Sequence, residues 1–226
     1  MKSSYKYEAT KGEQLILKYK LREPLTDAAN PGLLVLLHGV GGNEDNMFRL
    51  AASLPEDMII VAARAPYTLK PDSYAWFGVQ FSPEGSIINA EQAEKSRTVL
   101  NLFVNQLTER FQIDKTRVYL GGFSQGGIMS YSVGLTFAPK FAGIFCLSGR
   151  LLKEVRPMIK SGPEIRDLKV FIAHGTDDRV LSVNYAREAM AYLQELGIYP
   201  EYHEYQMPHS MEQQEIDDLN RWLRCG

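Results

Sequence analysis

The chain has 226 residues, of which 45% are hydrophobic and 23% are charged, and its formal net charge is −2. This composition is ordinary for a globular protein and the chain is long enough for one substantial core, so we expect a single domain over residues 1–226. The small net charge gives no reason to expect nucleic acid or an anionic membrane as a partner.

Two further features bear on the cellular compartment. No apolar run approaches the roughly 20 residues that a membrane-spanning helix requires, and residues 1–8 lack the apolar segment of a signal peptide. Cys146 and Cys225 do not suggest a disulfide framework, and free thiols fit a reducing compartment. The sequence therefore predicts a cytoplasmic protein without a membrane span. Nothing in it predicts an oligomeric state.

The chain opens with strand signals. Residues 4–22 contain two short β-like pieces, the second at residues 14–19, and together they predict a hairpin at the edge of a sheet. Residues 33–37 form a continuous apolar run, as expected of a strand that is buried on both faces.

The next segments alternate between helix and strand signals. Asn43 or Glu44 begins a short predicted helix, and residues 58–62 are the next buried strand. Residues 64–88 are rich in Pro, Gly and aromatic side chains and predict a long irregular segment. Its aromatic content argues against disorder, so we expect a functional loop. Residues 89–111 predict a long amphipathic helix.

The same alternation continues to the end of the chain. We expect a strand at residues 118–122, a helix at 124–137, strands at 141–147 and 169–173, a helix at 182–196, a strand near an edge at 201–206, and a last helix around 216–223. Strands that are apolar on both faces and alternate with helices predict an α/β fold, in which helices cover both faces of a mostly parallel sheet.

One strand and the helix after it are joined by Gly122-x-Ser124-x-Gly126. A serine on a sharp strand-to-helix turn adopts strained backbone angles, and its neighbours two residues away must lack Cβ atoms. The strain lifts the hydroxyl clear of the sheet, and the following helix directs its positive end at the site. Glycines also occur in plain turns, so the pattern predicts a nucleophile only together with partners elsewhere in the chain.

A serine hydroxyl becomes a good nucleophile when a base removes its proton and a carboxylate orients that base. In α/β-hydrolases the order along the chain is Ser, then Asp or Glu, then His. Two histidines, His203 and His209, follow the region that would supply the acid. His209 lies in the loop between the last strand and the last helix, which favours it as the base.

The acid is expected after a strand that follows Ser124, where Asp177 and Asp178 stand. We prefer Asp178, and Asp177 remains an alternative because aspartate also occupies turns for local reasons. The carboxyl ends of parallel strands meet at one edge of a sheet, so His38, Ser124, Asp178 and His209 are all expected there.

An oxyanion formed on the substrate would need two backbone N–H donors. One comes from Gln125, directly after the nucleophile, and the other from Val40 in the glycine-rich loop after the strand at 33–37. This loop does not complete a dinucleotide-binding pattern, because Glu44 occupies the last glycine position. With no H-E-x-x-H pattern and no Cys/His cluster, the sequence predicts neither a metal nor a cofactor.

Six short motifs occur in a specific order along the chain. They are Leu37-His38-Gly39-Val40-Gly41, Ala75-Trp76-Phe77, Gly122-Phe123-Ser124-Gln125-Gly126-Gly127, Leu147-Ser148-Gly149, His174-Gly175-Thr176-Asp177-Asp178 and His209-Ser210. The ordered set resembles the phospholipase/carboxylesterase family, which includes bacterial carboxylesterases and acyl-protein thioesterases. The resemblance runs from about Leu33 to the C-terminus.

The resemblance implies an α/β-hydrolase fold without a large cap domain, acting on esters or thioesters of short-to-medium acyl chains. It implies a catalytic triad of Ser124, Asp178 and His209, with Val40 and Gln125 as oxyanion donors. The implied substrate is a small-molecule ester or thioester, with acylated proteins as a further class. A lysophospholipase, a dienelactone-type hydrolase or a non-catalytic ligand-binding protein on the same scaffold are the alternatives.

We expect four large side chains on the acyl side of the site, namely Leu69, Trp76, Phe77 and Phe123. Two residues depart from the pattern of the family. Gly78 stands where an acidic residue often follows Trp-Phe, and Arg150 stands where an aromatic residue often follows Leu-Ser-Gly. Both positions are expected near the acyl pocket, where they would affect the choice of substrate.

Overall fold

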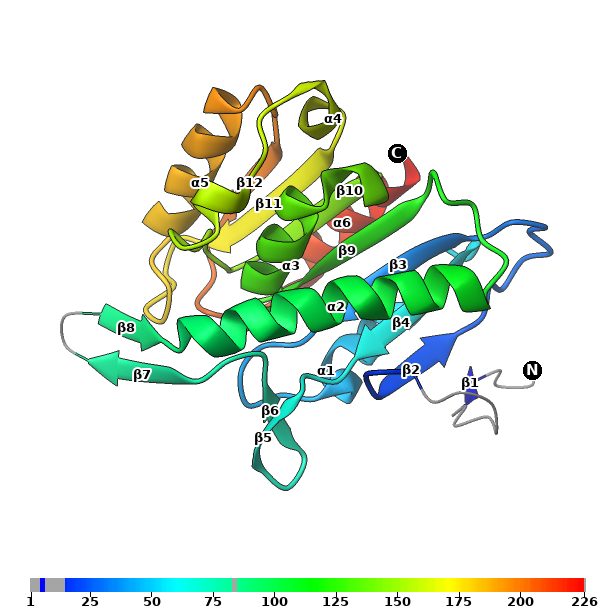
Figure 1. Ribbon diagram of the computed structural model, residues 1–226, viewed down its shortest axis with the longest axis horizontal. Coiled ribbons are helices and arrows are strands. Elements are labelled where there is room, and N and C mark those ends of the chain that lie inside the picture. Colours follow the sequence, from blue (N-terminus) through cyan, green and yellow to red (C-terminus); the bar gives the residue numbers. More distant parts are fainter. Residues whose placement is uncertain (1–4, 7–14, 83–84, 226) are drawn as a thin grey trace.

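The computed structural model describes residues 5–6, 15–82 and 85–225, and the side chains within them except at residues 5, 6, 81, 82, 85 and 86. In this part of the chain, eight strands form one central sheet in the spatial order β1-β2-β4-β3-β9-β10-β11-β12 (Figure 1). The strands are β1 (Tyr5–Lys6), β2 (Tyr19–Arg22), β3 (Gly32–Leu37), β4 (Met58–Ala63), β9 (Val118–Phe123), β10 (Gly143–Leu147), β11 (Lys169–Gly175) and β12 (Glu201–Tyr205). β2 pairs antiparallel with β1 and β4, and the strands from β4 to β12 pair in parallel.

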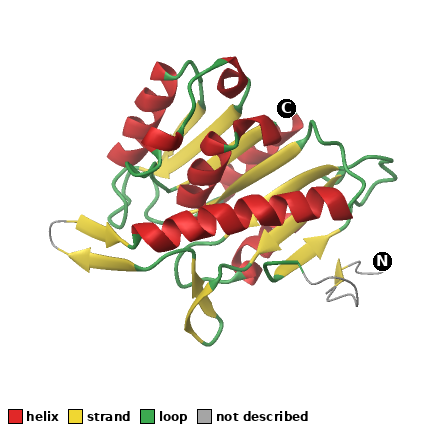
Figure 2. Cartoon of the chain, viewed as in Figure 1, coloured by secondary structure: helices red, strands yellow, loops and turns green. Residues whose placement is uncertain are grey.

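Helices cover both faces of this sheet (Figure 2). They are α1 (Glu44–Phe48), α2 (Ala90–Arg110), α3 (Gln125–Thr136), α4 (Pro163–Arg166), α5 (Asn184–Glu195) and α6 (Gln213–Arg224), with 3-10 turns at η1 (Arg49–Ala52), η2 (Ala138–Lys140) and η3 (Arg156–Met158). The α2, α3 and α5 helices pack on one face, and α1 and α6 pack on the other. The mostly parallel α/β architecture predicted from the sequence is thus confirmed.

Strand β3 explains why the sequence pattern is so apolar. Alternate residues face opposite sides of a strand. Leu33, Val35 and Leu37 accordingly join the core under α2 and α3, whereas Leu34 and Leu36 join the core under α1 and α6. All five side chains are completely buried. A strand sandwiched between two helical layers has no polar face, and this is why residues 33–37 read as one apolar run.

The N-terminal strand pairing differs in position from the prediction. β2 covers Tyr19–Arg22, not residues 14–19, of which residue 14 lies outside the described residues. Arg22 is almost fully buried, because its guanidinium donates to the main-chain carbonyls of Ala51 (2.8 Å) and Met58 (3.0 Å).

Residues 64–88 were predicted to be irregular, and this was wrong. The segment folds into two antiparallel hairpins, one of β5 (Tyr67–Lys70) and β6 (Ser73–Ala75), the other of β7 (Val79–Ser82) and β8 (Gly85–Ile88). Strands of three or four residues are too short for a clear alternation of polar and apolar side chains. The turn of the first hairpin contains Asp72 with φ 57°.

The long helix agrees with its prediction. Asn89 is the N-cap of α2, and its side-chain oxygen accepts the N–H of Gln92 at 3.0 Å. Phe111 is the C-cap residue. No helix in the described residues is long and apolar enough to cross a bilayer. Beyond the short hairpins, no separate cap domain covers the carboxyl edge of the sheet in the described ranges.

Candidate active site

The carboxyl ends of neighbouring parallel strands bring the predicted site residues to one edge. Ser124 follows β9, Asp178 lies just after β11, and His209 lies in the connection between β12 and α6. Strand β10 lies between β9 and β11, and β12 lies beside β11. Side chains separated by 85 and 31 positions in the sequence therefore meet at one place.

The turn at Ser124 has the strained geometry that the glycine pattern predicts. Ser124 has φ 53° and ψ −117°, a region that L-residues rarely adopt. A Cβ at Gly122 or Gly126 would collide with the carbonyl oxygen of Leu37 in β3. The two glycines let β9 and α3 pass against β3, and the serine is held at the N-terminus of α3, where the helix dipole is positive.

Three side chains form a hydrogen-bonded series at this edge. The Nε2 atom of His209 lies 2.9 Å from the Oγ of Ser124, and its Nδ1 lies 2.6 Å from the Oδ2 of Asp178. A carboxylate can only accept, so Nδ1 carries the proton and Nε2 is free to accept the serine O–H. The other carboxylate oxygen, Oδ1, accepts the backbone N–H groups of Val180 and Leu181, both at 2.8 Å. Asp178 is thereby held in one orientation.

The sequence alternatives lie outside this series. Asp177 is exposed, whereas the side chain of Asp178 is fully buried. His203 lies in β12, where its Nε2 is 3.0 Å from the Oε1 of Glu201 and its ring packs against Phe171. Neither residue has a contact with Ser124 among those that the structure describes.

A second histidine, His174, lies beside the carboxylate of Asp178, and the sequence analysis did not predict this contact. The Nε2–H of His174 donates to the carbonyl of Leu181 at 2.7 Å and lies 3.2 Å from the Oδ2 of Asp178. Burial lowers the pKa of His174, which keeps it neutral near neutral pH. The side chain therefore supports the carboxylate without adding a full positive charge beside His209. The spacing of four residues between His174 and Asp178 was the only signal in the sequence.

The glycine-rich loop after β3 is fixed from several sides. His38 donates from Nδ1 to the carbonyl of Gly39 (2.7 Å) and accepts the N–H of Ala65 at Nε2 (3.1 Å). The indole N–H of Trp76 donates to the carbonyl of His38 at 2.9 Å. Burial lowers the pKa of His38, which favours the neutral imidazole, and in this form the side chain holds the loop by hydrogen bonds.

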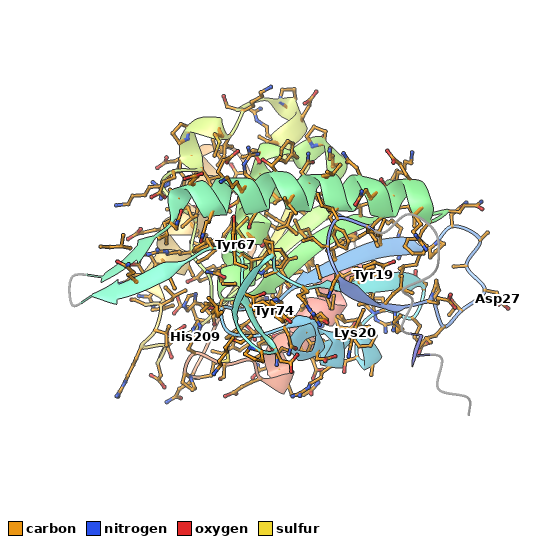
Figure 3. The ribbon with its side chains drawn as sticks, turned by 60° about the horizontal axis from the view of Figure 1, so that its bottom comes forward. Tyr19, Lys20, Asp27, Tyr67, Tyr74 and His209 are labelled. Carbon is orange, nitrogen blue, oxygen red and sulfur yellow. The ribbon has the colours of Figure 1, made fainter. Side chains whose placement is uncertain are left out.

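The first hairpin holds the same loop by main-chain pairing. Gly41 donates to the carbonyl of Tyr74 at 2.8 Å, and Tyr74 donates to the carbonyl of Gly42 at 2.9 Å. The phenol of Tyr74 accepts a hydrogen bond from Arg64, which also pairs with Glu44 at the start of α1. Figure 3 brings this side of the molecule forward and labels Tyr74 and His209. The hairpin therefore braces the loop that contains Val40.

The two predicted oxyanion donors both border the site. Val40 and Gln125 line the same cavity as Ser124 and His209. In the part of the chain that the structure describes, neither the N–H of Val40 nor that of Gln125 donates to a backbone carbonyl in a turn, loop or cap. The side chain of Gln125 has a separate structural role, which the sequence did not reveal. It accepts the N–H of Trp76 and donates to the carbonyl of Phe77, both at 2.7 Å.

The cavity beside Ser124 has a volume of about 160 Å³ and is mostly apolar. Its apolar lining is formed by Val40, Phe77, Val79, Ile88, Phe123, Ile128, Val180 and Leu181. The predicted acyl-side residues Phe77 and Phe123 are thus part of the wall, and the ring of Phe123 lies 4.9 Å from that of His209. Arg150, which departs from the family pattern, also lines this cavity.

Leu69 and Trp76 do not line this cavity, contrary to their predicted place. Trp76 is completely buried, and its indole N–H faces the carbonyl of His38 behind the wall. Leu69 is 53% exposed on the β5–β6 hairpin. Aromatic or apolar character alone does not indicate which side of a loop faces a ligand. In the described part of the chain, no group of three or more His, Cys, Asp or Glu side chains could hold a metal ion.

Comparison with known proteins agrees with this geometry. The sequence matches the phospholipase/carboxylesterase family over residues 26–225. Acyl-protein thioesterases 1 of Emericella nidulans and Mycosarcoma maydis are 32% and 38% identical over 133 and 117 residues, which are 57% and 50% of this chain. The chain spans about half the length of these two relatives, 55% and 49%.

A solved structure of esterase PE8 superposes with a TM-score of 0.80 at 26% identity, and the alignment covers 92% of this chain and 98% of that one. The strand order, the helical layers and the family match over residues 26–225 are in agreement. The chain belongs to the phospholipase/carboxylesterase family and has an α/β-hydrolase fold.

Proposed function

We propose that this protein is a serine hydrolase that cleaves esters or thioesters of short-to-medium acyl chains through an acyl-enzyme on Ser124. The observation that carries the proposal is the series Ser124–His209–Asp178, with contacts of 2.9 and 2.6 Å, beside an apolar cavity. The family match and the thioesterase and esterase names of the relatives support it. They favour it over a lysophospholipase or a dienelactone-type hydrolase.

In the first half of the reaction, the Oγ of Ser124 attacks the acyl carbonyl while the Nε2 of His209 takes the hydroxyl proton. Negative charge develops on the carbonyl oxygen, and the N–H groups of Val40 and Gln125 donate to it. His209 then gives its proton to the leaving alcohol or thiol, and the acyl group stays on Ser124. Asp178 keeps the proton of the histidine on Nδ1 and stabilises the imidazolium.

In the second half, a water molecule replaces the leaving group. His209 removes a proton from this water as it attacks the acyl-enzyme, and then returns a proton to Ser124 as the carboxylic acid departs. The apolar walls formed by Phe77 and Phe123 favour the acyl chain over water. Small-molecule esters and thioesters are the proposed substrates, with acylated proteins as a further class that the names of the relatives suggest. We also propose a cytoplasmic location, since the free Cys146 and Cys225 suit a reducing compartment.

Steady-state kinetics on p-nitrophenyl esters of increasing acyl length, and on matched thioesters, tests the proposal. We expect Ser124→Ala to lower kcat by about 10⁴–10⁶-fold, because the nucleophile is removed. Ser132→Ala is a matched control, since Ser132 lies in α3, the helix that follows Ser124, and its hydroxyl donates only to the carbonyl of Ile128. Near-normal turnover by Ser124→Ala, or no turnover of any ester or thioester by the wild type, would contradict the proposal.

A further inference from the structure

Arg150 reaches the site from the strand between those that position the proposed nucleophile and acid. It follows β10, which is paired with β9 on one side and β11 on the other. Arg150 lines the cavity together with Ser124 and His209. The chain therefore places an arginine in the wall of the site, among lining residues that are mostly apolar.

The guanidinium of Arg150 has no counter-ion in the described residues. It lies over the ring of Tyr185 at 5.4 Å, and its Nε is buried without a hydrogen-bond partner. No described carboxylate lies within ion-pair distance of it, and Asp178, which contacts the lining residue His209, is already held by that histidine and by two backbone N–H groups. In contrast, five other arginines pair with carboxylates, namely Arg64, Arg97, Arg117, Arg187 and Arg221.

Chemistry then indicates what such a group would bind. Arginine stays charged at all ordinary pH values, and its planar fork matches the two oxygens of a carboxylate. In apolar surroundings an unpaired cation is costly, and an anionic ligand relieves that cost. Among the described lining residues, Arg150 is the one side chain with a fixed positive charge, which matches a single negative charge.

We infer that the preferred substrate is an ester or thioester that bears a carboxylate, and that Arg150 binds this carboxylate and sets the specificity. The inference rests on the proposed hydrolase function, which it refines by naming the substrate class. The carboxylate can belong to the acyl part, as in a dicarboxylic acid half-ester, or to the leaving group. The two cases present the same chemistry to Arg150, and substrates distinguish them.

Two pairs of substrates separate these cases. Mono-p-nitrophenyl glutarate and p-nitrophenyl hexanoate compare an anionic and a neutral acyl chain of similar length. Likewise, p-carboxyphenyl acetate and p-carbamoylphenyl acetate compare an anionic and a neutral leaving group. The measured quantity is the ratio of kcat/KM, anionic over neutral, within each pair. Differences in intrinsic reactivity cancel when the same ratio is compared between variants.

We expect Arg150→Met to lower this ratio by about tenfold to a hundredfold in one pair, because a charge-assisted hydrogen bond is lost. Arg150→Lys keeps the charge and should retain part of the ratio. Arg156→Met is a closely matched control. Arg156 also lies over a tyrosine ring, that of Tyr192 at 4.6 Å, and also has a buried Nε without a partner, but it does not line the cavity.

The inference is overturned if Arg150→Met has the same ratio of kcat/KM as the wild type in both pairs. It is also overturned if Arg156→Met lowers this ratio as much as Arg150→Met does. Binding of glutarate to the wild type and to Arg150→Met, measured by calorimetry, provides a test that does not depend on turnover. If the wild type cleaves neither neutral nor anionic esters, the proposed hydrolase function fails. Weaker glutarate binding in Arg150→Met would still support the carboxylate site, and equal or undetectable binding in both would refute it.

Discussion

At the level of single residues, Asp178, the proposed acid, has partners on both of its carboxylate oxygens. Both oxygens of Asp178 are used, one by two backbone N–H groups and one by His209, with His174 close to the latter. Its neighbour Asp177 is exposed to solvent. Two adjacent carboxylates therefore have different surroundings, although the sequence left both as candidates.

Exchanging each aspartate for asparagine tests this distinction. We expect Asp178→Asn to lower kcat by about 10³–10⁴-fold, because an amide no longer holds His209 in the tautomer that accepts the serine proton. Asp177→Asn should stay close to the wild type. The measurement is kcat and KM for one p-nitrophenyl ester, and a larger loss in Asp177→Asn would reverse the assignment.

The sequence led to some of these residues and not to others. Chain order and strand ends predicted that Ser124, Asp178 and His209 would lie at one edge, as the structure has them. The side-chain bonds from Gln125 to the main chain of Trp76 and Phe77 join positions almost fifty residues apart and carry no sequence signal. Contacts of this kind depend on how two loops meet, which a single sequence does not record.

At the level of elements, the site depends on close passage of α3 against β3. Gly126 lies in the first turn of α3, where a side chain would meet the carbonyl of Leu37 at the end of β3. The same contact fixes the direction in which Ser124 leaves the sheet. The packing of a helix against a strand thus sets the geometry of the proposed nucleophile.

Adding one methyl group at this position tests the role of the contact. We expect Gly126→Ala to lower the free energy of unfolding by about 1–3 kcal/mol or more, because the backbone atoms it meets cannot move aside easily. Gly162→Ala is the control, since a Cβ there would meet nothing within 4 Å. Urea unfolding measures the free energy of unfolding of both variants. Equal unfolding midpoints for Gly126→Ala and Gly162→Ala would contradict the close packing of α3 against β3.

Buried parallel strands could be predicted because both their faces are apolar, but the short hairpins could not. β5 to β8 are strands of only three or four residues, and Tyr74 in β6 pairs with the glycine-rich loop, which is distant in the sequence. The burial of Arg22 in β2 was likewise not predicted, since only the folded chain supplies the carbonyls that bind its guanidinium. A local sequence pattern predicts which residues of a strand are buried, whereas contacts between residues distant in the sequence depend on the fold.

At the level of the whole molecule, a completely buried carboxyl group in α6 makes stability depend on pH. Glu215 in α6 is completely buried, and desolvation raises its pKa to about 8, with the carboxylate of Glu212 adding to the shift. The folded state therefore holds this proton more tightly than the unfolded state. The stability that results is fully present below the unfolded pKa and is lost as the pH rises toward about 8.

The free energy of unfolding should thus contain a part that falls with pH by about 1.4 kcal/mol per unit across this window. Glu215→Gln should remove that part and should be more stable than the wild type at about pH 8 to 9. Urea unfolding from about pH 5 to about pH 9 measures the slope. Glu188→Gln changes an exposed carboxyl and serves as the control. Parallel pH profiles of Glu215→Gln and the wild type would contradict the expectation.

The nucleophilic role proposed for Ser124 can be measured directly by covalent labelling. A fluorophosphonate reacts when a serine oxygen attacks phosphorus, fluoride leaves and a base takes the hydroxyl proton. Peptide mass spectrometry of the labelled protein then identifies the modified residue. We expect a single adduct on Ser124, none in Ser124→Ala and much slower labelling in His209→Ala. An adduct on another residue, or labelling that proceeds at the same rate without His209, would contradict the proposed site.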